Sequence, residues 1–109
     1  MQAKKVVLVG NGYVMQMVKY YLSEITGVAV VEIQAGTNEE MALFVKQEQP
    51  DAIIIEQSPA SQGFLEMLFM IARNTNIKLV EVNPHSNTIH VANWNQIRLE
   101  RMQDFMAVL

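Results

Sequence analysis

The chain has 109 residues, of which 50% are apolar and 17% charged, with a net charge of -3 and no cysteine. This length supports one domain, residues 1–109, with its own core, and the lack of cysteine excludes disulfides, thiolate zinc sites and a cysteine nucleophile. The mild acidity argues against nucleic-acid or membrane partners, which need clustered Lys and Arg. Because no apolar run approaches the ~20 residues that span a bilayer and the N-terminus lacks a signal-peptide pattern, we expect a soluble cytoplasmic protein.

Four short apolar runs predict strands. They are mostly continuous rather than alternating and rich in β-branched residues, which is typical of strands covered on both faces in a parallel sheet. The runs are residues 6–9, 28–31, 52–55 and 77–82.

Segments with helical periodicity separate these runs. The first predicted helix begins at Tyr13 and stops before Gly27. A second begins at Thr37, because Glu40 three residues later completes a capping box, and it cannot continue past Pro50. The apolar stripe of the first helix consists of Val14, Met17, Val18, Tyr21, Leu22 and Ile25.

The pattern changes after the fourth run. Residues 88–92 and 96–99 each alternate apolar and polar side chains, and the residues between them read as a turn, which predicts a hairpin at the sheet edge. A last helix is predicted over residues 102–109, with apolar spacings of 3, 4 and 7. Strands that alternate with helices imply right-handed crossovers and a three-layer α/β sandwich.

Ligands of such sheets bind beyond the carboxyl ends of the strands. Gly10-Asn11-Gly12 begins like the G-x-G of a dinucleotide site, and Glu32 lies 20 residues past Gly12, where a ribose-binding acid would stand. Met15 replaces the third glycine of that fingerprint, and the chain lacks the second half of a dinucleotide fold. Two glycines also suit a tight strand-to-helix turn. A small nucleotide- or dinucleotide-binding sensor domain is therefore the alternative function.

The run from Pro50 to Glu56 carries a second resemblance. Its Pro-Asp and apolar run followed by an acid are similar to the third strand of response-regulator receiver domains, where an acceptor aspartate ends the run. Residues 4–9 resemble the first strand of that family, and the strand–helix alternation agrees over nearly the whole chain. The resemblance implies a flavodoxin-like sandwich with parallel strand order 2-1-3-4-5, to which this chain adds the edge hairpin.

The chain departs from the receiver pattern at the phosphorylation site. Glu56 stands at the phosphoacceptor position, one methylene longer than aspartate, and Gly10-Asn11 replaces the acidic pair that holds magnesium in the family. Magnesium prefers hard anionic oxygen ligands. Asn83 ends a fourth strand that lacks the family's small hydroxyl residue. These changes imply a pseudo-receiver in two-component signalling that needs neither phosphate nor a metal or other cofactor.

Several single residues have competing interpretations. Glu56 is either a phosphate mimic that fixes one signalling state or a solvated acid at a strand end. Asp51 fits a turn residue at the start of a strand better than a catalytic acid. His85 and His90, the two histidines, match no compact metal motif. No nucleophile, base and orienting acid come together, so the sequence predicts no enzyme.

The third predicted helix, from near residue 61 to about 73, is unusually apolar. Between residues 64 and 72 only Glu66 is polar, whereas a helix on a sheet needs one apolar stripe. Either neighbouring elements cover the surplus, or it forms an association surface for a protein partner or a homodimer. The candidate surface residues, with one at the predicted hairpin tip, are Met67, Phe69, Met70 and Trp94.

Overall fold

The computed structural model describes most of the chain, with the backbone alone for residues 62–65, 88–91 and 96–98. The described residues are 4–10, 12–34, 37–57, 62–83, 85, 88–91 and 96–98. The elements follow each other as β1 (Lys4–Val9), α1 (Tyr13–Ser23), β2 (Val28–Ile33), α2 (Asn38–Glu48), β3 (Ala52–Glu56), α3 (Gln62–Asn74), β4 (Lys78–Asn83), β5 (Thr88–Val91) and β6 (Gln96–Arg98).

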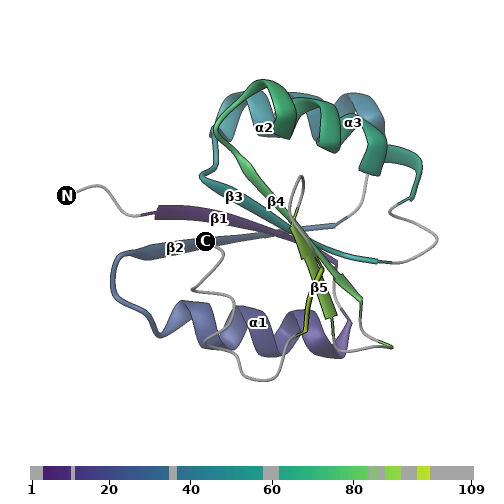
Figure 1. Cartoon of the computed structure of the whole chain (residues 1–109). Coiled ribbons are helices and arrows are strands. Elements are labelled where there is room, and N and C mark those ends of the chain that lie inside the picture. Colours follow the sequence, from purple (N-terminus) through teal and green to yellow (C-terminus); the bar gives the residue numbers. More distant parts are fainter. Residues whose placement is uncertain are drawn as a thin grey trace.

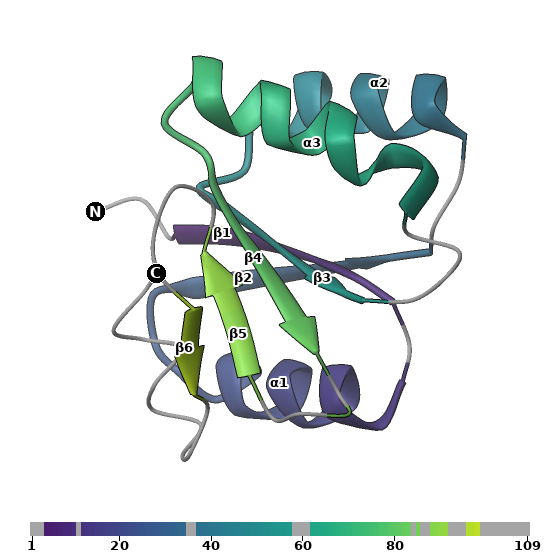
Figure 2. The same cartoon turned by 45° about the vertical axis from the view of Figure 1, so that its right-hand side comes forward.

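One sheet with the strand order β2-β1-β3-β4-β5-β6 organises these elements. Its first four strands are parallel neighbours, and each connection between them contains a helix. Helix α1 covers one face of the sheet, while α2 and α3 lie side by side on the other (Figures 1 and 2). The fold is therefore a three-layer α/β arrangement with four parallel strands, compatible with a flavodoxin-like fold.

The fifth strand reverses direction. β5 runs antiparallel to β4, and β6 antiparallel to β5, so these two strands form a hairpin at the sheet edge, as predicted. Residues 84–87 alone connect β4 to β5, and a parallel crossover needs about a dozen residues. The five-stranded parallel order 2-1-3-4-5 is therefore not confirmed, because the parallel part of the sheet ends with β4. The predicted last helix lies outside the described residues.

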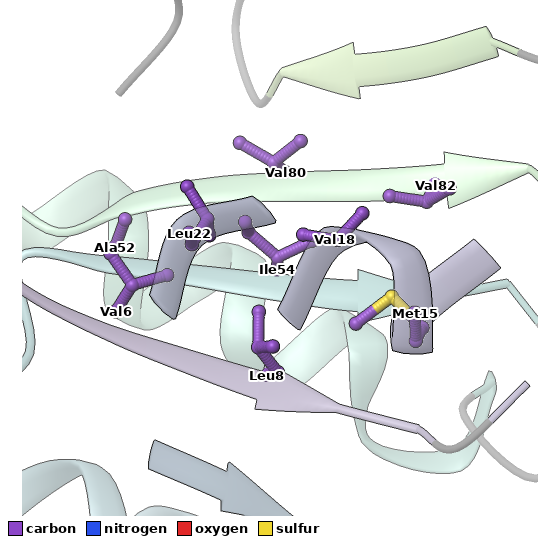
Figure 3. Close-up of a cluster of buried hydrophobic side chains, with 9 residues drawn as sticks. All are labelled: Val6, Leu8, Met15, Val18, Leu22, Ala52, Ile54, Val80 and Val82. Atoms are coloured by element: carbon purple, nitrogen blue, oxygen red, sulfur yellow. The ribbon is translucent and has the colours of Figure 1, made fainter. Parts of the chain in front are cut away.

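The continuous apolar runs of the central strands serve two cores. Side chains alternate along a strand, so in β1 Val6 and Leu8 face α1, whereas Val7 and Val9 face α2 and α3. All four are at most 2% exposed. Figure 3 shows the core on the α1 side, where three side chains of α1 meet those of β1, β3 and β4. Burial on both faces explains why the middle of each central strand is rich in consecutive apolar residues.

Helix α1 turns most of the predicted stripe toward the core, where Val18 and Leu22 are buried and Val14, Tyr21 and Ile25 pack against them. Its buried residues are Met15, Val18 and Leu22, each at most 1% exposed, whereas Met17 is 40% exposed. The spacings 3 and 4 of the buried residues place them on one side of the helix. The predicted stripe was therefore wrong at Met17 and omitted Met15, because neighbouring apolar residues in this segment support two overlapping stripes.

Local signals at two other positions are confirmed. Thr37 Oγ1 accepts a hydrogen bond from Glu40 N at 3.1 Å, and Glu40 Oε1 accepts one from Thr37 N at 3.2 Å, which completes the capping box of α2. Asp51 lies just before β3, where its carboxylate accepts a hydrogen bond from Lys5 N at 2.7 Å. Asp51 thus joins the starts of β1 and β3, at the edge of the sheet opposite to the candidate site.

Candidate functional site

The candidate site lies where β1 and β3 end beside each other. Val9 is opposite Ile55 in the sheet, so the residues that follow them, Gly10 and Glu56, emerge at the same edge. Glu56 follows Ala52 and Ile54 in the alternation of β3 and therefore faces α1. Helix α1 begins immediately after Gly12, its N-cap residue. The half-buried Glu56 side chain is thus directed at the first turn of α1.

The Glu56 side chain makes a close approach to both glycines. A Cβ atom added to Gly12 would lie 2.6 Å from Glu56 Oε1 and 2.7 Å from its Cδ, and a Cβ added to Gly10 would lie 3.0 Å from Glu56 Cβ. Gly10 also has a φ of 124°, which side-chain-bearing residues rarely adopt. The missing side chains of the two glycines therefore make room for Glu56.

The position of Glu56 has an electrostatic consequence for α1. The first backbone N–H groups of a helix lack intrahelical partners and carry a partial positive charge. Helix α1 has no acidic residue in its first turn and no side-chain cap from Gly12. The carboxylate beside Gly12 supplies negative charge from β3 instead. A bound phosphate takes this place at a helix N-terminus in nucleotide sites, so here the chain fills it with its own anion.

Glu32, the predicted ribose-binding acid, is engaged with α1. It forms an ion pair with Lys19, and Gln16 Nε2 lies 3.5 Å from Glu32 Oε1. The hydrogen bond from Lys19, together with its charge and the bond from Gln16, holds the pKa of Glu32 below its ordinary value. The role of Lys19 was not predicted. The sequence signal for this role was the spacing of three residues between Gln16 and Lys19, which places both side chains on the side of α1 next to β2.

Asn83 closes a turn. Its Oδ1 accepts a hydrogen bond from His85 N at 3.0 Å, which is an Asx turn directly after β4. By alternation Asn83 shares the face of Leu79, which packs on the side of α2 and α3. Glu56 lies on the α1 side, so the structure does not bring Asn83 and Glu56 together. Asn11, the other predicted pocket residue, lies outside the described residues.

The predicted association surface on α3 is mostly packed. Leu68 is buried, and Met67 and Phe69 are half-buried against the core on this side of the sheet, in which α2 also takes part. Met70 is 61% exposed. The exposed part of that predicted surface is therefore one methionine, and Trp94 lies outside the described residues.

Two surface grooves lie away from Glu56. One of about 420 Å³ runs between α2 and α3, where Val45, Lys46 and Ile71 contribute to its lining. The other, of about 440 Å³, follows the outer face of α1. Among the residues that the structure describes, no three His, Asp or Glu side chains gather closely enough to hold a metal ion, and no described helix is long and apolar enough to cross a membrane.

Comparisons of the chain with models of protein families, with curated proteins and with solved structures find no match. The geometry of the residues is therefore the basis for a function, above all the contact between Glu56 at the end of β3 and Gly12 at the start of α1.

Proposed function

We propose that the protein is a receiver-like regulatory module of two-component signal transduction that acts without phosphorylation, through association with another protein or with itself. The observation that carries this proposal is the Glu56 carboxylate against Gly12. Glu56 ends the third strand of a parallel sheet, which is the phosphoacceptor position implied by the receiver resemblance. Its negative charge already stands at the N-terminus of α1, so of its two interpretations we favour the phosphate mimic.

The chemistry around Glu56 supports this proposal. Phosphoryl transfer to a carboxylate needs divalent cations to neutralise the charge of the transferred group. Magnesium is held by carboxylates that leave room for several waters, and in the part of the chain described by the structure Glu56 belongs to no group of three His, Asp or Glu side chains that could hold a metal ion. Gly10 and Gly12 contribute only backbone atoms next to Glu56, and the backbone provides no anionic ligand for a magnesium ion. A permanent carboxylate can hold a binding surface in one state, whereas reversible phosphorylation switches such a surface between two states.

Mass spectrometry after incubation with acetyl phosphate and magnesium tests the proposal. We expect no added phosphoryl group on the wild-type protein. The Glu56→Asp variant should also stay unmodified, because it restores the acceptor residue of receivers but not their magnesium-binding acids. A phosphoryl group on Glu56 that is lost in Glu56→Gln would overturn the proposal.

The nucleotide-binding alternative has less support. The carboxylate of Glu32 is already paired with Lys19, and Glu56 fills the space beside Gly12 that a phosphate would need. Met15, which stands in the place of the third glycine, is 1% exposed on the inner face of α1. Binding of a dinucleotide would require the Lys19–Glu32 pair to open and the Glu56 side chain to move.

A further inference from the structure

The outer face of α1 carries the largest exposed aromatic side chains among the described residues. Tyr13 is 80% and Tyr20 72% exposed, with Met17 between them at 40%. Glu24, the exposed C-cap residue, continues the row. Exposed apolar patches of this kind mark interaction sites. We call these four residues the α1 stripe; they lie on the side of the helix opposite to the buried Met15, Val18 and Leu22.

The α1 stripe is complementary to itself. Consider a second copy of α1 that runs antiparallel beside the first, with the two-fold axis level with the midpoint between Val18 and Lys19. Tyr13 then lies opposite Glu24 of the partner subunit, and Met17 lies opposite Tyr20 of the partner subunit. The groove along α1 has the same symmetry, because its other two lining residues, Gln16 and Tyr21, are exchanged as well. We infer that α1 docks antiparallel on α1 of a second copy, with the stripe as the contact. This inference rests on the proposed action through association and assigns it to α1 rather than α3.

Each exchanged pair is chemically favourable. Met17 meets Tyr20 of the partner subunit, and a thioether packs well against an aromatic ring. The phenol of Tyr13 can donate a hydrogen bond to Glu24 of the partner subunit. Within its own chain Glu24 lies at the negative end of the α1 dipole, and the last turn has no basic residue to offset it. The second copy therefore supplies a donor for Glu24 that the last turn of α1 does not provide.

Charge near the two-fold axis does not oppose this contact. Lys19 is the charged residue closest to the axis, and like charges would meet there if it were unpaired. Its ion pair with Glu32 neutralises it and holds it toward β2.

The contact area sets the expected strength of the dimer. An aromatic side chain buries about 150–250 Å², so the four tyrosines of the two copies contribute on the order of 600–1,000 Å². That value is below the roughly 1,200–2,000 Å² of stable interfaces, and we expect a reversible, micromolar dimer.

Engineered disulfides test the contact and its direction, because the chain has no cysteine of its own. Positions 13 and 24 are about 16 Å apart along one helix, too far for a bond within a chain. The double variant Tyr13→Cys/Glu24→Cys should form a covalent dimer on mild oxidation, whereas either single variant stays monomeric on a non-reducing gel. The antiparallel contact would be overturned if a single variant formed the covalent dimer, or if the double variant did not.

Sedimentation equilibrium of two matched surface variants provides a second test. Tyr20→Glu should weaken the dimer at least tenfold, while Met70→Glu on α3 should leave it unchanged; thermal unfolding checks that both fold. A monomeric wild type at millimolar concentration, or a dimer that only Met70→Glu dissociates, would overturn the inference. Neither result alters the phosphorylation assay, so failure here is distinguishable from failure of the non-phosphorylated state.

Discussion

Glu56 connects the sheet to the first turn of α1. An anion near a helix N-terminus stabilises a protein by about 0.3–1 kcal/mol, and by up to about 2 kcal/mol where it is partly buried. Glu56 is half-buried, and its carboxylate lies where a Cβ atom of residue 12 would otherwise stand. The residue therefore has a structural effect that can be measured without knowledge of a signalling partner.

A double-mutant cycle measures this contact. Gly12→Ala places a methyl group where the Glu56 carboxylate now lies, so we expect it to cost about 1–2 kcal/mol, part of it from the poorer N-cap and the rest from displacing the carboxylate. In a Glu56→Ala background that second part should vanish, which gives a coupling of about 0.5–1 kcal/mol in urea unfolding. Additive losses would contradict the contact.

The lowered pKa of Glu32 predicts a pH dependence. Because its folded pKa lies below the ordinary glutamate value of about 4.3, the pair with Lys19 adds stability above that pH and loses it as the pH falls through the folded pKa. An NMR titration of the Glu32 carboxyl carbon should show a midpoint that rises in Lys19→Gln. Lys46→Gln, on α2 across the sheet, should leave the midpoint unchanged. An unchanged midpoint in Lys19→Gln would show that the pair does not form in solution.

At the scale of elements, α2 ends in a strained residue. Gln49 is its C-cap with φ 46° and ψ 58°, the left-handed region, which costs side-chain-bearing residues about 1–2 kcal/mol. Gln49→Gly should therefore raise the free energy of unfolding by about 0.5–1 kcal/mol after glycine's greater entropy loss. The control Gln47→Gly, inside the same helix, should lower it by about 1 kcal/mol. Equal losses in both variants would argue against the left-handed cap.

Elements with strong local signals could be predicted from the sequence. The capping box of Thr37 and Glu40 fixes the start of α2 through neighbouring residues alone, and the four apolar runs that form β1 to β4 have no competing pattern. One position of the inner face of α1 could not be predicted, because Met15 and Met17 are equally apolar and only packing against the sheet selects Met15. The contact of Glu56 with Gly12 joins residues 44 apart (56 − 12), so no local pattern contains it.

At the scale of the whole molecule, four parallel strands place the ends of β1 and β3 side by side, and this arrangement brings Glu56 to α1. The antiparallel β5 could be suspected from the alternation of residues 88–92, but its direction depends on the short connection after β4. The proposed association surface also depends on the whole fold. Residues 64–72 are apolar in sequence apart from Glu66, yet α2 and the sheet contact much of α3, and the exposed aromatic side chains of the described part of the chain lie on α1.

Thermal unfolding in the presence of magnesium beryllofluoride, NAD or ATP, each at millimolar concentration, tests the central claim most directly. A ligand at 100 times its dissociation constant stabilises a protein by about 2.7 kcal/mol, which shifts the midpoint of a domain of this size by several degrees. We predict no shift with any of the three, because the Glu56 carboxylate already fills the anion position at the start of α1. A shift with beryllofluoride would reveal a working phosphoacceptor pocket and contradict the account, and a shift with NAD or ATP would replace it with the nucleotide-binding function.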